Sequence, residues 1–319
     1  MYQFRRFRPH RFEAVVHSCL LFHLVVTDMA DKSAARPEDM IFPVPLGLRE
    51  VPSWHAKMAE GGPVVISVEA AIGTGKSSLL RLMEKVSNNR WIVVQEPVDV
   101  WQRVDGEHNL LGAFYENQER YSFSFQTYCV LSRIQALEEA LEALKPTTEV
   151  IILERCWHSD RNTFAEMLRA RGKMSPMEWS LYDQWYRFAV KNAPRIDGHI
   201  YLQCTTDTCM SRLRKRDRSE EVGVTDEYQS ELIKRHEAWL SSVPAEQQLR
   251  INVDRDFVSD AERGKAVVAE ISEFVAKLRT VRDAHVAELR QSPLLRLSPL
   301  FAPQPVFPVS EAAPAHPLR

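Results

Sequence analysis

The segment from Pro63 to Leu80, PVVISVEAAIGTGKSSLL, most strongly constrains how this chain can fold. It joins an apolar run typical of a buried strand to a glycine-containing turn and then to an amphipathic helix. Gly73 and Gly75 allow a tight turn in which successive backbone N–H groups point inward at phosphate oxygens. Ala70 stands where the usual pattern GxxxxGK[ST] has its first glycine, so the match is incomplete. The spacing still favours a nucleotide-binding loop over an ordinary turn before a helix.

The loop and the start of the next helix carry the groups that would hold a triphosphate. Lys76 supplies a point charge, Ser77 a hydroxyl for Mg²⁺, and the helix from Lys76 to about Lys85 directs its positive end at the phosphates. We therefore predict ATP, or another nucleoside triphosphate, and Mg²⁺ as cofactors. The predicted nucleotide contacts in this segment are Ala71, Ile72, Gly73, Thr74, Gly75, Lys76, Ser77 and Ser78.

Five apolar runs rich in Val and Ile alternate with helical stretches along the chain. They are PVVISVE, WIVVQEP, EVIILER, GHIYLQC and QLRINVD. Strands that helices cover on both faces have such continuous apolar runs, so we predict an α/β fold with a five-stranded parallel sheet wrapped by helices. Ligands of these sheets collect at the carboxyl ends of the strands. Glu69, Glu96 and Glu154 lie at the ends of the first three runs and are expected to gather there.

Glu96 and Glu154 are candidates for chemistry on a phosphate. Near the glycine loop, one carboxylate can orient or deprotonate an attacking hydroxyl while the other helps to hold Mg²⁺. Arg155 would add positive charge on the developing phosphoryl oxygens. Spacing alone does not decide which carboxylate has which task, and a strand-ending glutamate is often only a solvated turn residue.

Composition and charge narrow the class of protein. The 319 residues are 45% hydrophobic and 26% charged, with a net charge of -2, and this balance gives no reason to expect a nucleic acid or a membrane as partner. The five cysteines are odd in number and have no CxxC spacing. This pattern argues against a disulfide framework and against a zinc site, and it favours a reducing compartment.

The chain divides into three regions. Residues 1–60 are predicted to be an N-terminal extension, either a targeting segment or disordered, residues 61–289 the folded body, and residues 290–319 a Pro-rich disordered tail. The first 29 residues are rich in arginine and then apolar over a run too short to span a bilayer. We expect a cytoplasmic protein, with mitochondrial import as the alternative that this segment leaves open.

Two further segments allow both a structural and a functional interpretation. Gln126, Cys129 and Arg133 share one face of a helix predicted from about Glu119 to Ala143, whose first half is apolar almost all round. A core network or the edge of a nucleobase can supply the partners that a buried amide and guanidinium need. The charged run at 214–221, RKRDRSEE, is either a solvated face or a mobile arginine-bearing lid over phosphates.

Several separated segments together resemble the deoxyribonucleoside kinases, in particular the deoxycytidine and deoxyguanosine kinase branches. The segments are VEAAIGTGKSS, QEPVDVW, NLLGAFYENQERYSFSFQTYCVLSRIQ, LERCWHSDR, IYLQCTTDTCMSRLRKRDRSEEVGV and EYQSELIKRHEAWL. The resemblance covers nearly all of residues 61–289, and it implies a P-loop kinase fold with an arginine-bearing lid and a homodimer formed through a helix bundle. The implied activity transfers the γ-phosphoryl group of ATP, or another nucleoside triphosphate, to the 5′-hydroxyl of a deoxyribonucleoside.

The resemblance also implies roles for individual residues. Glu96 would be the general base on the 5′-hydroxyl, with Arg155 beside it and Glu154 in the magnesium shell. The remaining implied contacts are Trp101, Leu111, Phe125 and Phe164 as walls around the base, Gln126 at its edge, Tyr115 and Glu221 on the sugar 3′-hydroxyl, and Arg212, Arg216 and Arg218 in the lid.

Arg133 and Asp160 match residues of the deoxycytidine and deoxyguanosine branches that the thymidine branch lacks. A paired Arg and Asp can present a carboxylate to an exocyclic amino group and leave no apolar space for the methyl group of thymine. We therefore predict deoxycytidine, deoxyadenosine or deoxyguanosine as the substrate. The small side chain of Cys129 would favour larger bases, so purine nucleosides stay among the candidates. The alternatives are a thymidine-preferring or broad-specificity kinase, a nucleoside monophosphate kinase, and a non-catalytic subunit with the same fold.

Overall fold

The computed structural model describes residues 53–216 and 224–291. The strands in these residues are β1 (Val64–Glu69), β2 (Trp91–Val94), β3 (Val150–Glu154), β4 (Gly198–Gln203) and β5 (Gln248–Asn252). The longer helices are α3 (Lys76–Val86), α6 (Gln118–Glu142), α9 (Pro176–Asn192), α10 (Thr206–Arg216), α11 (Asp226–Leu240) and α12 (Ala261–Gln291). The shorter helical elements are α2 (Ser53–Ala59), α4 (Val98–Gln102), α5 (Leu110–Glu116), α7 (Trp157–Ser159), α8 (Glu166–Ala170), a π-helical turn (Asp160–Ala165) and a 3-10 turn (Ala245–Gln247).

Some predictions fall outside the described residues. The arginine-rich N-terminal segment and the Pro-rich tail beyond residue 291 belong to this group, as do Arg218 and Glu221. The backbone of Arg216 ends α10, but its side chain is not described. α2 lies just before residue 61, where the folded body was predicted to begin, and its Trp54 is buried in the core.

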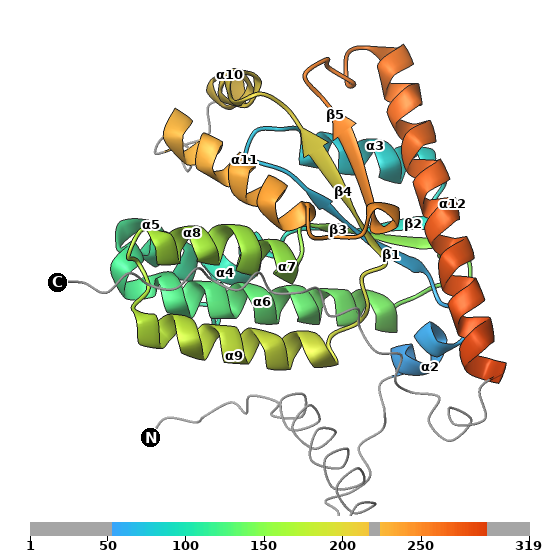
Figure 1. Ribbon diagram of the computed structural model, residues 1–319, viewed down its shortest axis with the longest axis horizontal. Coiled ribbons are helices and arrows are strands. Elements are labelled where there is room, and N and C mark those ends of the chain that lie inside the picture. Colours follow the sequence, from blue (N-terminus) through green and yellow to red (C-terminus); the bar gives the residue numbers. More distant parts are fainter. Residues whose placement is uncertain (1–52, 217–223, 292–319) are drawn as a thin grey trace, which may run out of the picture. The chain divides into compact units, whose positions relative to one another are not determined.

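All five strands pair in parallel, in the order β2-β3-β1-β4-β5 (Figure 1). The predicted α/β fold with a five-stranded parallel sheet is confirmed. β1 lies at the centre of the sheet, and its Val68 is in register with Glu154 of β3. Because of this register, the loop that follows β1 emerges beside the carboxyl ends of β3 and β4, where parallel sheets bind their ligands.

Alternate residues of β1 face two separate apolar clusters, because successive side chains of a strand point to opposite faces. Val64 and Ile66 pack in a cluster with residues of α3 and α12. Val65 packs instead in a cluster with residues of α6 and α9, and Figure 1 shows these two helices side by side. The sheet is therefore covered by helices on both faces, which explains why its strands have continuous apolar sequences.

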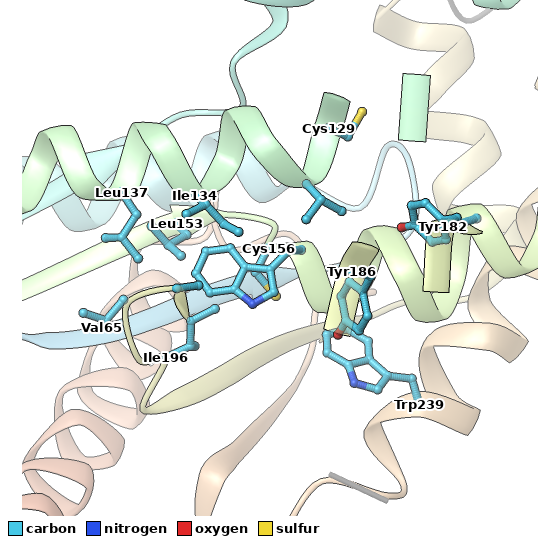
Figure 2. Close-up of a cluster of buried hydrophobic side chains, with 14 of the residues drawn as sticks. Val65, Cys129, Ile134, Leu137, Leu153, Cys156, Tyr182, Tyr186, Ile196 and Trp239 are labelled. Atoms are coloured by element: carbon cyan, nitrogen blue, oxygen red, sulfur yellow. The ribbon is translucent and has the colours of Figure 1, made fainter. Parts of the chain in front are cut away.

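The cluster on the α6 side extends from Val65 near the start of β1 to Cys156 beyond the end of β3. Figure 2 shows Leu137 of α6 close to Leu153 of β3, with Cys156 beside them. Trp157 belongs to the same cluster and is buried. Its large ring therefore packs in the core behind β3.

Cys204 and Cys209 form a disulfide, with their Cα atoms 6.6 Å apart. The expectation from the number and spacing of the cysteines is therefore wrong for this pair. Cys204 directly follows β4 and Cys209 lies in the first turn of α10, so the start of the helix brings the two side chains together. The link is local, and Cys129 and Cys156 are free and buried.

Loss of this disulfide should destabilise the fold by about 2 kcal/mol, because a short closed loop restricts the unfolded chain only modestly. Urea unfolding of the oxidised protein and of a Cys204→Ser/Cys209→Ser double variant would measure the difference. The wild-type chain in excess reductant is the matched control and should unfold near the midpoint of the variant. Identical midpoints for the oxidised wild type and the variant would contradict a stabilising link.

Candidate active site

The loop after β1 turns through two glycines in the left-handed region, with φ of +77° at Gly73 and +111° at Gly75. A Cβ on Gly73 would lie 2.8 Å from the carbonyl oxygen of Cys209 in α10, so close packing also requires glycine here. Ala70 does not have a positive φ. The methyl group of Ala70 therefore adds no backbone strain, and the loop tolerates alanine where the usual pattern has glycine.

Gln229 of α11 holds the loop through both polar groups of its amide. Its Oε1 accepts a hydrogen bond from the backbone N–H of Ile72 at 3.3 Å, and its Nε2 donates to the carbonyl oxygen of Ile72 at 2.5 Å. Gln229 is not among the site residues predicted from the sequence. Gln229 precedes the buried Leu232 and His236 by three and seven positions, so the helical period marked it as a buried polar residue.

Arg212 is the one predicted lid arginine whose side chain lies within the described residues. Its guanidinium donates to the carbonyl oxygen of Thr74 at 3.1 Å and to that of Val253 at 2.7 Å. Arg212 therefore ties the phosphate loop to the segment after β5. Contact of Arg216 and Arg218 with a nucleotide stays a prediction.

Lys76 and Ser77 begin α3 opposite the end of β3. The hydroxyl of Ser77 donates a hydrogen bond to Glu154 Oε1 at 3.1 Å. These two oxygen atoms lie side by side, as the ligands of a magnesium ion would. Burial and the nearby Arg155 lower the pKa of the Lys76 amine to about 8, although nearby glutamates raise it. An incoming phosphate would favour the charged form of this amine.

Glu96 follows β2 and lies between two arginines. Its Oε1 accepts a hydrogen bond from Arg133 Nη2 and is 3.8 Å from Arg155 Nε. Burial alone would raise the pKa of Glu96, but Arg133, Arg155 and Lys76 together hold it below its usual value. The carboxylate is therefore ionised at neutral pH, which is the form that can accept a proton.

Arg155 is held in an unusual conformation at the end of β3. Its φ of +63° is in the left-handed region, which a non-glycine residue adopts at a cost of about 1 kcal/mol or more. The guanidinium lies over the ring of Phe164, 4.8 Å from its centre. Its Nη1 is buried and has no hydrogen-bond partner among the described residues. A buried donor of this kind is suited to an anionic group of a ligand.

Arg133 of α6 and Asp160 form a buried pair, as predicted from the sequence. Arg133 Nε donates to Asp160 Oδ2 at 2.7 Å, and Arg133 Nη1 donates to the carbonyl oxygen of Glu154 at 2.9 Å. Burial raises the pKa of Asp160 to about 6, although Arg133 opposes the shift. The carboxyl group of Asp160 is thus mostly ionised at pH 7 and acts as a hydrogen-bond acceptor.

Aromatic side chains form a wall next to this pair. Trp101 of α4 meets Phe125 of α6 edge to face, with ring centres 5.4 Å apart, and Phe114 of α5 stacks on Phe125 at 4.5 Å. Phe114 was not predicted as part of the site. Gln126, next to Phe125, is 3% exposed, and its Oε1 has no hydrogen-bond partner among the described residues. The edge of a base would supply the donor that this oxygen lacks.

The other predicted substrate contacts, the wall residues Leu111 and Phe164, Cys129, and Tyr115 for the sugar, are less tightly gathered. Cys129 is buried on the α6 face that also carries Arg133, and Leu111 packs at the margin of the same apolar cluster. Phe164 lies under Arg155, in a smaller cluster with residues of the phosphate loop. Tyr115 is 57% exposed, and its ring contacts that of Phe114.

A hollow of about 600 Å³ lies elsewhere, just before β1 and β3, and is lined by residues such as Gly61, Thr148 and Arg282. None of the predicted site residues lines it. The predicted residues gather instead at the carboxyl ends of the strands, as parallel sheets require.

Comparison with known proteins agrees with this geometry. Residues 66–276 match the profile of the deoxynucleoside kinase family. The chain is similar to deoxycytidine kinase 2 of Gallus gallus, with 33% identity over 241 residues that cover 66% of this chain and 89% of that protein. Mitochondrial deoxyguanosine kinase of Xenopus laevis is 33% identical over 241 residues (67% and 90%). Deoxycytidine kinase of Homo sapiens is 33% identical over 262 residues (72% and 98%).

Proposed function

The chain belongs to the deoxynucleoside kinase family, and we propose that it phosphorylates the 5′-hydroxyl of deoxycytidine, deoxyadenosine or deoxyguanosine. The phosphate donor is ATP or another nucleoside triphosphate. The observation that carries this proposal is the ionised carboxylate of Glu96, held by Arg133 and Arg155 beside the lysine of the phosphate loop.

In the proposed reaction Glu96 accepts the proton of the nucleoside 5′-hydroxyl as the oxygen attacks the γ-phosphorus atom. Lys76 and the loop amides bind the donor phosphates, and the unpartnered Nη1 of Arg155 can donate to the transferred group. Ser77 and Glu154 would hold Mg²⁺, which neutralises phosphate charge when bound. The protein therefore acts mainly by positioning the reactants and by neutralising charge.

The proposed choice of base depends on two buried acceptors next to the aromatic wall. Asp160 is oriented by Arg133, and Gln126 presents an oxygen that no described residue occupies. Exocyclic amino groups of cytosine and adenine are suitable donors to such acceptors, and guanine also carries an amino group. Thymine has no amino group, so it would leave a buried acceptor without a partner.

We further propose that two copies of the chain associate through α9. Met177 and Leu181 are 70% and 51% exposed on this helix, and Trp185 and Phe188 stack at the next positions of the same stripe. A stripe of large apolar side chains at helical spacing is suited to packing against a second helix.

For the compartment, we propose the cytoplasm or, if the arginine-rich N-terminal segment directs import, the mitochondrion. Among the relatives, the Xenopus laevis protein is named as mitochondrial. No helix of the described residues is both long enough and apolar enough to cross a bilayer. Fractionation of cells that express the full chain, with and without residues 1–28, would distinguish the two compartments.

A Glu96→Gln variant should lower kcat by about 10²- to 10⁴-fold, because the amide cannot accept the proton. Steady-state phosphorylation of the preferred deoxynucleoside, with circular dichroism as a check of folding, would measure the effect. Glu84→Gln, which changes an exposed glutamate of α3, is the matched control and should leave kcat unchanged. Full activity in the Glu96→Gln variant would exclude this residue as the base.

The ranking of substrates tests the choice of base. With MgATP and each deoxynucleoside assayed separately, kcat/KM should be highest for deoxycytidine, deoxyadenosine or deoxyguanosine, and lower for thymidine by about tenfold or more. Asp160→Asn should reduce that difference, because an amide can donate as well as accept. A value for thymidine above all three others would show that the assignment of the pocket is wrong.

A Leu181→Glu variant should weaken or abolish the dimer, because it introduces a charge into the apolar stripe of α9. Size-exclusion chromatography with light scattering would report the mass. Val281→Glu changes a similarly exposed apolar residue on α12 and should not alter the mass. A wild-type chain that is monomeric at micromolar concentration would argue against association.

A further inference from the structure

Three side chains that are typical metal ligands meet beneath the phosphate loop. Glu69 ends β1, Cys156 follows β3, and His199 lies in β4. Each offers one ligand atom, and these atoms all lie within 4.8 Å of one another. Glu69 and Cys156 are 0% exposed and His199 is 1% exposed. Glu69 and His199 lie in the adjacent strands β1 and β4, and Cys156 follows β3 on the other side of β1, so the order of the strands brings the three residues near one another.

The carboxylate of Glu69 requires an explanation. It is fully buried, and apart from the neighbouring thiol of Cys156 neither of its oxygens has a hydrogen-bond partner among the described residues. A buried carboxylate costs several kcal/mol unless it is well paired, and proteins normally pair it or use it to coordinate a cation. Lys76 interacts electrostatically with Glu69, but it also interacts with Glu96 and Glu154. The ligand atoms of Cys156 and His199 are close neighbours of this carboxylate, yet neither side chain supplies a compensating positive charge when His199 is neutral.

The three groups suit one cation better than others. A thiolate, an imidazole and a carboxylate together are a ligand set for Zn²⁺, and a thiolate ligand disfavours Mg²⁺ and Ca²⁺. One Zn²⁺ balances the two negative charges of Glu69 and deprotonated Cys156, so the occupied site would be neutral. Ser67 Oγ lies 2.7 Å from Nδ1 of His199 and so orients the ring, as a second-layer partner of a metal ligand does.

We propose that Glu69, Cys156 and His199 form a structural zinc site that links β1, β3 and β4 directly beneath the phosphate loop. Zinc–ligand bonds of about 2.0 to 2.3 Å require ligand atoms roughly 3.5 Å apart, so binding would draw inward any pair that lies farther apart within the 4.8 Å limit. The thiol proton of Cys156 leaves when the metal binds. Glu69, Cys156 and His199 would supply three of the four ligands of a tetrahedral zinc ion.

The site would have a defined role in the fold. Glu69 directly precedes the phosphate loop and Cys156 directly follows Arg155, so a metal bound to both would hold the loop and this arginine at a constant separation. The spacing of the cysteines predicted no zinc site. The ligands are 87 and 43 positions apart in sequence and come one from each strand, so no local motif marks them.

Metal content tests the proposal without an assay of kinase activity. The full chain, purified without chelators and dialysed against Mg²⁺, should retain about one Zn²⁺ per chain by elemental analysis. Cys156→Ser and His199→Ala should each weaken zinc binding by more than about 100-fold. Loss of a metal ligand lowers the affinity more than loss of a residue that only hydrogen-bonds a ligand, which costs about 10- to 100-fold. Cys129→Ser removes the other buried free cysteine and should retain the metal.

A second measurement needs no variant that might misfold. Co²⁺ added to the metal-free wild type should give a thiolate-to-cobalt charge-transfer band, and added Zn²⁺ should raise the melting temperature while Mg²⁺ should not. A wild type that contains no zinc and gives no such band would overturn the proposal. Equal loss of metal in Cys129→Ser and Cys156→Ser would overturn it as well, whatever the kinase assays show.

Discussion

The buried guanidinium of Arg133 is the contact on which the arrangement of the candidate site depends. It bonds Glu96 after β2, the main chain of Glu154 at the end of β3, and Asp160 in the π-helical turn. A charge taken out of water is tolerated only when it is well paired, so each of these segments must stay where its acceptor meets the arginine. Burial alone would lower the pKa of Arg133, but Asp160 and Glu96 outweigh that effect and keep the residue charged.

The guanidinium of Arg133 connects two parts of the candidate site, the proposed general base and the proposed contact of the nucleobase. Glu96 is the proposed general base, and Asp160 is the proposed hydrogen-bond acceptor for the nucleobase. Both carboxylates pair with the same guanidinium, that of Arg133. The ring of Trp101 lies against the guanidinium as well, 5.2 Å from its centre. Arg133 of α6 therefore fixes the positions of Glu96 and Asp160 relative to one another.

The phosphate loop depends in the same way on α10 and α11. Gln229 bonds both polar groups of Ile72, and Arg212 bonds Thr74. Gly73 allows α10 to approach so closely that a methyl group would collide with it. α10, which leads to the predicted lid, thus also contacts the phosphate loop. A displacement of α10 would therefore change the conformation of the loop.

The sequence identified the elements that depend on local pattern. We could recognise in the sequence the strand, loop and helix around Lys76, the five apolar runs and the start of α6. Strands buried on both faces have continuous apolar sequences, and tight turns require glycine. The helical period also placed Gln126 and Arg133 on one face, but it left their partners open. The structure gives Arg133 three partners within the protein and leaves Gln126 Oε1 with none among the described residues.

By itself, then, the sequence determined the kind of fold, the nucleotide loop and the family resemblance. The tertiary structure alone decided which distant residues meet: Glu69 with Cys156 and His199, and Gln229 with the loop. These contacts follow from strand order and from the angle at which helices return to the sheet. Both result from packing over the whole domain, and no short stretch of residues encodes them.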